Sequence, residues 1–105
     1  MTGTWHRVAS TDEWPEVAMR AFVIEGREVV VCHSRGGWFA IDNICTHALA
    51  RLCEGRLRGH RLICPLHGAS FDIRDGRVLG APATAPLAAH RVRIADGQIE
   101  VALGG

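Results

Sequence analysis

Two short stretches of the chain each place one cysteine and one histidine close together: Cys45 with His47, and Cys64 with His67. Sixteen residues separate the two pairs. Thiolate sulfur is a soft, anionic ligand and imidazole is a neutral, borderline one, so four such side chains suit either a zinc ion or an iron–sulfur cluster. The pattern therefore predicts a metal site with four protein ligands, delivered by two separate loops.

The mixed composition of each pair distinguishes these two kinds of site. Zinc modules usually present like ligands together, with two cysteines on one loop and two histidines or cysteines on the other. Mixed pairs suit two irons bridged by sulfide, because each loop can then give its cysteine to one iron and its histidine to the other. On this interpretation Cys45 and Cys64 bind one iron, and His47 and His67 bind the second.

The run Cys45-Thr46-His47, followed after sixteen residues by Cys64-Pro65-Leu66-His67-Gly68, resembles the signature of Rieske proteins. From about Trp5 to Leu103 the chain is also similar to the small Rieske ferredoxins of bacterial aromatic-ring-hydroxylating dioxygenases. The resemblance implies one Rieske 2Fe-2S cluster, bound by the two cysteines and two histidines named above. It also implies a one-electron carrier between a flavin-containing reductase and a terminal Rieske oxygenase.

The same resemblance suggests where the reduction potential lies. High-potential Rieske proteins of respiratory complexes carry a disulfide at the positions of Ala50 and Leu66, and serine and tyrosine hydroxyls at those of Ala69 and Phe71. None of these groups is present in this chain. Fewer hydrogen bonds to sulfur leave the added electron less stabilised, which predicts a potential of roughly −150 mV, at the low end of the Rieske range.

Two other functions stay open at the level of sequence. The first is a Rieske-type small subunit of an assimilatory nitrite reductase, which neighbouring genes would distinguish. The second, from another class, is a zinc-binding interaction module, which would be colourless where a Rieske protein is reddish-brown. An enzyme is not expected, because the chain offers no nucleophile–base pair beyond the ligand candidates and no phosphate-binding glycine loop.

The composition sets further limits. The 105 residues suit one domain, and 48% of them are hydrophobic, as in a globular protein. The net charge of +1 does not indicate nucleic acid or an anionic membrane as a partner. Without an apolar run near the ~20 residues of a membrane helix, and without a signal core, the chain is expected in the cytoplasm. There, four cysteines favour metal chemistry over disulfides.

Short apolar runs separated by turn residues predict an all-β fold, a small antiparallel β-sandwich or barrel with an inserted cluster-binding lobe at about 43–71. Residues 1–105 would form a single domain. Helical signals are weak, with at most a turn or two over 13–20, and 80–89 is expected to be a loop. The expected strands are 5–8, 20–24, 28–32, 38–41, 56–58, 61–63, 70–73, 91–94 and 98–103.

The remaining cysteines and histidines are interpreted as structural. Cys32 lies in an apolar strand and Cys53 inside the lobe, so both are expected to be packed thiols. The other histidines lack a partner at ligand spacing and are expected at the surface or at strand edges: His6, His33, His60 and His90. Trp5, Trp14 and Trp38 are expected to pack in the core.

Two further features of the lobe suggest function. Its local excess of arginine over Glu54 suggests a patch for a redox partner, although solvated side chains would explain the same residues: Arg51, Arg56, Arg58 and Arg61. The segment 80–86, with Pro82 and Pro86, is placed where the resembling family has a proline-containing loop that shields its cluster from water.

Overall fold

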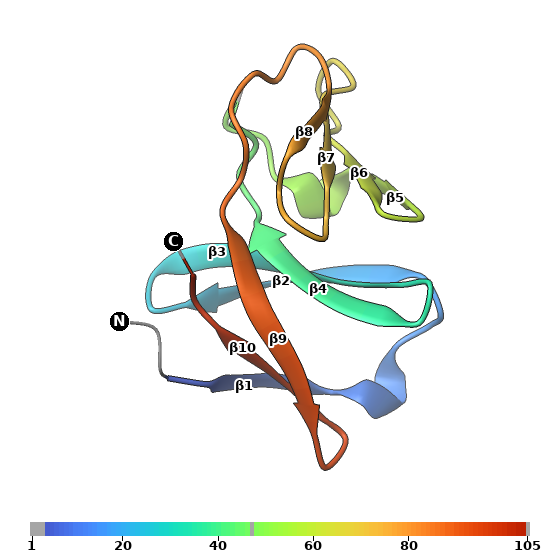
Figure 1. Ribbon diagram of the computed structural model, residues 1–105, viewed down its shortest axis with the longest axis vertical. Coiled ribbons are helices and arrows are strands. Elements are labelled where there is room, and N and C mark those ends of the chain that lie inside the picture. Colours follow the sequence, from blue (N-terminus) through green and yellow to red (C-terminus); the bar gives the residue numbers. More distant parts are fainter. Residues whose placement is uncertain (1–3, 47, 105) are drawn as a thin grey trace.

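The computed structural model describes residues 4–46 and 48–104 as ten strands in two antiparallel sheets. The first sheet has six strands in the order β1-β10-β9-β4-β3-β2 and curls into a nearly closed barrel (Figure 1). The meander expected from three apolar runs is the β2-β3-β4 part of this sheet. The strands are β1 (His6–Ser10), β2 (Ala18–Ile24), β3 (Arg27–Ser34), β4 (Gly37–Asp42), β9 (Ala89–Ala95) and β10 (Gln98–Ala102).

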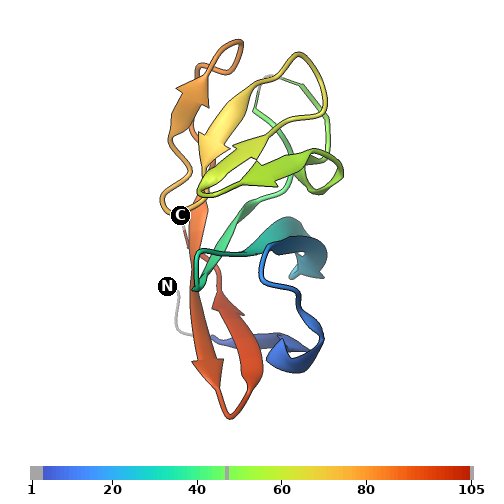
Figure 2. The ribbon, with the colours of Figure 1, turned by 90° about the vertical axis from the view of Figure 1, so that its right-hand side faces the viewer.

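The second sheet is inserted in the chain between β4 and β9, and it forms a lobe at one end of the barrel (Figure 2). Its four strands have the order β5-β6-β7-β8. All pairings in both sheets are antiparallel, so the prediction of an all-β barrel with an inserted lobe is confirmed. The lobe strands are β5 (Arg56–Arg58), β6 (Arg61–Ile63), β7 (Ser70–Asp72) and β8 (Val78–Gly80).

Strand β3 contributes side chains to the cores of both parts of the molecule. Val29 and Val31 pack into the barrel core, whereas Val30 and Cys32 pack into the lobe core. Successive side chains of a strand point to opposite faces, so a strand buried on both faces needs an unbroken apolar run. That requirement explains the sequence Val-Val-Val-Cys at 29–32, and it confirms that Cys32 is a buried structural thiol.

Two expectations about secondary structure are wrong. Helical turns do not form over 13–20: a single 3-10 turn, η1 (Thr11–Glu13), is followed by β2, which begins at Ala18 and pairs with β3 along its whole length. Residues 78–80 form β8, although no strand was expected there. Its three residues carry too little pattern to predict a strand, and pairing with Ser70 and Phe71 of β7 defines it.

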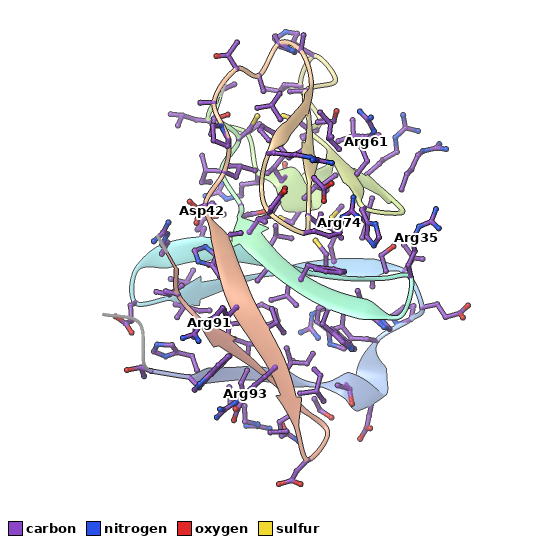
Figure 3. All side chains as sticks on the ribbon, viewed as in Figure 1. Arg35, Asp42, Arg61, Arg74, Arg91 and Arg93 are labelled. Carbon is purple, nitrogen blue, oxygen red and sulfur yellow. The ribbon has the colours of Figure 1, made fainter. Side chains whose placement is uncertain are left out.

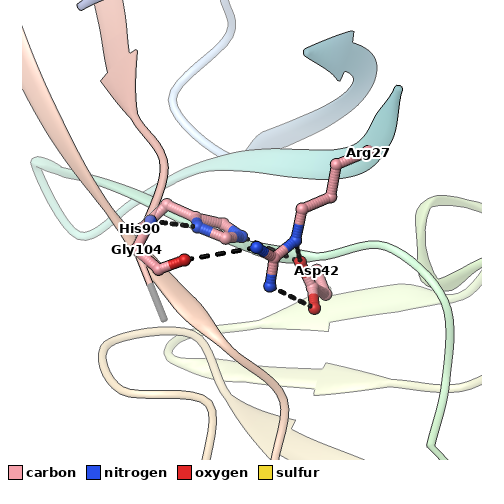
Figure 4. Close-up of polar contacts among 4 residues, drawn as sticks. All are labelled: Arg27, Asp42, His90 and Gly104. Carbon is pink, nitrogen blue, oxygen red and sulfur yellow. Dashed lines mark hydrogen bonds and ion pairs between the residues drawn. The ribbon is translucent and has the colours of Figure 1, made fainter. Parts of the chain in front are cut away.

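The expectation that His90 lies at the surface is also wrong, since its side chain is fully buried. Its Nδ1 accepts a hydrogen bond from the Gly104 N–H at 2.9 Å, so Nε2 carries the proton and donates it to Asp42 Oδ1 at 2.8 Å (Figure 4). Arg27 completes this group with two bonds to the Asp42 carboxylate and one to the Gly104 carbonyl. These contacts fasten the end of β4, where the chain leaves the barrel for the lobe.

Within residues 4–46 and 48–104, the structure contains no helix with the length and apolar character needed to cross a membrane.

Candidate metal centre

Both candidate cysteine ligands lie together in the lobe core. Cys45 and Cys64 are 3% and 2% exposed, and their thiols hydrogen-bond to each other. All four cysteines are free thiols. Two buried thiols in contact, packed among apolar side chains and not joined in a disulfide, are poised to share one metal ion as thiolates.

Burial raises the pKa of the Cys64 thiol, and its hydrogen bond with Cys45 raises that pKa further. The backbone N–H of Leu66 donates to the Cys64 sulfur and opposes this shift. An N–H aimed at sulfur favours the thiolate form, which is the form that binds metal. The loop of residues 64–69, the second ligand loop, therefore supplies a hydrogen bond that suits a metal-bound thiolate.

The two loops that carry the cysteines are closed by the same kind of backbone bond. The N–H of Cys45 donates to the Ala50 carbonyl at 2.9 Å, and the N–H of Cys64 donates to the Ala69 carbonyl at 2.7 Å. In both loops the acceptor lies five residues after the cysteine. The Cys/His pair occurs twice in the sequence, and in the structure the cysteine of each pair begins a loop that is closed by the same backbone hydrogen bond.

His67 occupies the tip of the second loop and is exposed. It has a φ of +62°, and Gly68 follows it with a φ of +76°. Left-handed backbone costs a residue with a Cβ roughly 1 kcal/mol, and such strain gathers at functional sites. The chain accepts this cost at a histidine that the sequence predicts to be a ligand.

The described residues contain no group of three or more histidine, cysteine, aspartate or glutamate side chains converging on one point. The structure brings together the thiols of Cys45 and Cys64, and His67 lies three residues after Cys64 in the same loop. The fourth candidate ligand, His47, lies outside the described residues.

The loop that begins at Cys45, the first ligand loop, is held to the barrel by an ion pair. Arg51 donates from Nε to Glu28 Oε1 at 2.9 Å and from Nη2 to Glu28 Oε2 at 3.1 Å. These bonds are the main reason why the pKa of Glu28 is lowered. Arg51 also pairs with Ile44 in an isolated β-bridge, so the ion pair fixes the base of the loop. Arg51, one of the arginines considered both as solvated side chains and as a partner patch, forms an ion pair within the molecule.

Asn43 secures the same loop from inside. It is fully buried, and its side-chain oxygen accepts the N–H of Cys53 at 2.9 Å. Its amide nitrogen donates to Glu28 Oε1 at 3.3 Å and to the Cys53 sulfur at 3.5 Å. Its backbone carbonyl accepts the N–H of Leu52, the first residue of the 3-10 turn η2 (Leu52–Glu54). Cys53 is therefore a packed, half-buried thiol, as the sequence suggested, and Asn43 is a support that the sequence did not reveal.

A third loop, residues 81–86, lies against the first. Thr46 donates from Oγ1 to the Ala85 carbonyl at 2.7 Å. Ala83 and Leu87 are buried in the lobe core, and the N–H of Leu87 donates to Gly76 at 2.8 Å. The proline-containing segment thus contacts a ligand loop directly, as a shield over the site would require.

Comparison with known proteins agrees with this arrangement. Residues 4–92 match the Rieske [2Fe-2S] domain. The chain belongs to the Rieske [2Fe-2S] family. Its cofactor is one Rieske-type 2Fe-2S cluster, in which two histidines replace two cysteines on one of the irons. The donor set fits that group: two buried thiols in contact, and an exposed histidine on the loop that carries one of them.

This Rieske chain is similar to ferredoxin components over almost its whole length. It is 38% identical over 98 residues to the ferredoxin of the naphthalene 1,2-dioxygenase system of Pseudomonas aeruginosa, covering 93% of each chain. A solved ferredoxin of carbazole 1,9a-dioxygenase from Nocardioides aromaticivorans superposes with a TM-score of 0.92 at 34% identity, covering 97% of this chain and 100% of that one. A chain from a solved oxygenase–ferredoxin complex in carbazole 1,9a-dioxygenase has a TM-score of 0.89 at 29% identity, with 93% and 92% covered.

Proposed function

We propose that this protein carries single electrons from a flavin-containing reductase to the terminal oxygenase of an aromatic-ring-hydroxylating dioxygenase system. The proposed ligands are Cys45 and Cys64 on one iron, and His47 and His67 on the other. The similar proteins are ferredoxin components of such systems, and one of them was solved with its oxygenase. We further propose that residues 1–105 act as one Rieske domain and that the protein works in the cytoplasm. The lobe was expected at about 43–71, but its sheet extends to β8, so it occupies the whole segment between β4 and β9.

One observation carries the proposal: two contacting buried thiols sit on two loops with the same closing bond, and the second loop ends in an exposed histidine. When bound, the cluster accepts and releases one electron at a time. The chain's own residues set the conditions for that chemistry. The apolar side chains of Phe71, Ala83 and Leu87 are buried in the same core cluster as the two thiols.

The exposed end of the site suits a brief encounter with another protein. Leu49 and Leu66, one on each ligand loop, are 92% and 46% exposed. His67, next to Leu66 in the second ligand loop, is exposed as well. Electron-transfer complexes are small and short-lived, so a limited apolar contact of this kind is sufficient. Among the described ligand candidates, His67 is exposed to an approaching partner, whereas Cys45 and Cys64 are buried.

No catalytic step is assigned to the chain. In a Rieske cluster the protein ligands and the bridging sulfides fill the coordination of both irons, so no position stays open for a reactant. The similar proteins belong to dioxygenase systems named for different compounds, naphthalene and carbazole. This difference is expected if the carrier never contacts the substrate.

The test begins with the purified protein. Two irons and two acid-labile sulfides per chain, with an EPR signal on reduction typical of mixed histidine and cysteine ligation, would support the cluster. Stoichiometric zinc without sulfide would refute it. Electron delivery is then tested with a flavin-containing reductase and candidate terminal oxygenases, by following reduction of the oxygenase under anaerobic conditions. If the protein reduced a nitrite reductase and no oxygenase, the partner would be the nitrite reductase and the proposed oxygenase would be refuted.

A further inference from the structure

The outward side of the lobe sheet is covered with arginine side chains. Arg58 of β5 pairs directly with Arg61 of β6, and Arg56 lies two residues before Arg58 on the same side of the strand. The alternate residues Leu57 and Leu62 point inward, where Leu62 is fully buried. Two more arginines follow β7 and reach back over it. We call this surface the arginine face: Arg56, Arg58, Arg61, Arg74 and Arg77.

The arginine face concentrates positive charge that the whole chain does not have. Residues 51–77 contain six arginines and three acidic residues. The rest of the chain contains six arginines and eight acidic residues, so the net charge of +1 conceals a positive lobe on a negative barrel. Such a separation of charge gives the molecule a dipole that orients it in the field of a charged partner.

Most of this charge is not neutralised within the molecule. Asp72, which is 2% exposed, pairs with Arg74 at 2.8 Å and with Arg77 at 3.4 Å, so one carboxylate serves two guanidinium groups. Arg61 donates to the neutral hydroxyl of Ser70 at 2.7 Å. Neither Arg56 nor Arg58 has an acidic partner among the described residues, and both are exposed.

The arginine face borders the ligand loops. β6 ends at Ile63, directly before Cys64, and β7 begins at Ser70, three residues after His67. At the opposite end, the guanidinium of Arg35 lies close to Gly59 in the β5–β6 turn and extends the basic surface towards the barrel. Figure 3 shows Arg35, Arg61 and Arg74 on the same side of the molecule. A partner attracted to the arginine face would therefore lie beside the second ligand loop.

We propose that the arginine face is the electrostatic docking surface for an acidic margin of the terminal oxygenase, beside the apolar contact around His67. The inference rests on the proposed function, and it assigns the face to the oxygenase because a similar ferredoxin was solved with its oxygenase. The competing structural explanation is protection of an edge, because β5 is the outer strand of its sheet and charged side chains block unwanted strand pairing. Edge protection predicts no effect on binding.

The test compares two double variants with the same change in net charge. Arg56→Gln/Arg58→Gln removes two charges of the arginine face that have no acidic partner among the described residues, and Arg7→Gln/Arg20→Gln removes two exposed charges from the barrel. Glutamine keeps β5 polar, so edge protection is retained. Each protein is loaded with its cluster, and its EPR spectrum is compared with that of the wild type. The partner is the terminal oxygenase that the wild type reduces in the assay described above.

Two quantities are measured from low to high salt: the Kd of the oxidised protein for the oxygenase, by calorimetry, and the second-order rate of electron transfer, by stopped flow. Loss of steering lowers association rates by about tenfold at low salt, which we expect for the arginine-face variant but not for the barrel variant. The dependence of the rate on salt should become shallower in the same variant. The reductase is assayed in parallel.

Three outcomes would overturn the inference: equal effects of both variants, no effect of either, or an effect confined to the reductase. A wild type that reduces no oxygenase would instead refute the proposed function, so the two failures are distinguishable.

Discussion

The hydroxyl of Thr46 and the carbonyl oxygen of Ala85, 2.7 Å apart, join two loops that are 39 residues apart in the chain. Thr46 stands between the ligand candidates Cys45 and His47, and Ala85 lies in the proline-containing loop. One hydrogen bond therefore ties the proline-containing loop to the first ligand loop.

Replacing Thr46 should loosen the contact between these two loops. Thr46→Val keeps the shape of the side chain but removes the donor, at a cost of about 1 kcal/mol for a hydrogen bond. We expect faster amide exchange in residues 81–86 and a several-fold faster loss of visible absorbance in the presence of a chelator. Thr46→Ser retains the hydroxyl and should behave like the wild type. Equal rates for both variants would show that the contact does not hold the loop.

The pair of Glu28 and Arg51 should matter for the first ligand loop more than for the fold. Exposed ion pairs contribute about 0–1 kcal/mol to global stability, so Arg51→Gln should change the midpoint of urea unfolding little. The cluster should nevertheless be lost faster, because Arg51 fixes the base of the loop. Arg93→Gln, which breaks an exposed pair with Glu100 on the barrel, is the matched control and should leave cluster retention unchanged.

Asp72 predicts a dependence of stability on pH. Hydrogen bonds from Arg74 lower its pKa from 3.8 to about 2 in the folded protein, and each pKa unit corresponds to about 1.4 kcal/mol. The contribution is complete above the unfolded pKa and is lost as the pH falls from about 4 through about 2. Asp72→Asn should therefore be about 2 kcal/mol less stable at pH 7, and its unfolding free energy should converge with that of the wild type at low pH. A difference as large at pH 2 as at pH 7 would rule out this linkage.

The cysteines should divide into two classes. Cys32 is fully buried, and burial raises its pKa to about 12, so it should resist alkylation until the protein unfolds. Cys32→Ala should retain the full complement of iron and sulfide, and lose about 1 kcal/mol of stability for the small cavity. Cys64→Ala should retain neither iron nor sulfide. Loss of the cluster in both variants would contradict the proposed ligand set.

The reduction potential should lie near the low end of the Rieske range, roughly −150 mV. Ala69 and Phe71, the two positions where the resemblance places hydroxyl donors in high-potential proteins, are fully buried and offer no hydroxyl. An EPR-monitored titration measures the midpoint directly. A value well above zero would mean that other donors compensate for the missing hydroxyls.

The sequence was most informative where spacing alone defines the chemistry. The four ligand candidates and the barrel with its inserted lobe followed from short motifs and from apolar runs bounded by turns. Cys32 could be interpreted correctly because a continuous apolar run leaves no exposed side of the strand. These features depend on neighbours in the chain, which the sequence displays.

What the sequence did not show depends on contacts between distant residues. His90 looks like any histidine on an alternating strand, and only Asp42 and Gly104, 48 and 14 residues away, make its burial possible. Asn43 and Glu28 likewise support a ligand loop through side chains that no motif connects. Arg51 and Arg58 look alike in the sequence. In the structure Arg51 forms an ion pair with Glu28, whereas Arg58 has no acidic partner among the described residues.

Because alternate side chains of β3 line both cores, the barrel and the lobe share a common wall. Disorder in the lobe would expose the lobe-facing side chains of β3, a strand that the barrel also needs. Neither the lobe nor the barrel can therefore be removed without destabilising the other. A chain that fails to acquire its iron would consequently be open to proteolysis as a whole, which couples the lifetime of the protein to the supply of its cofactor.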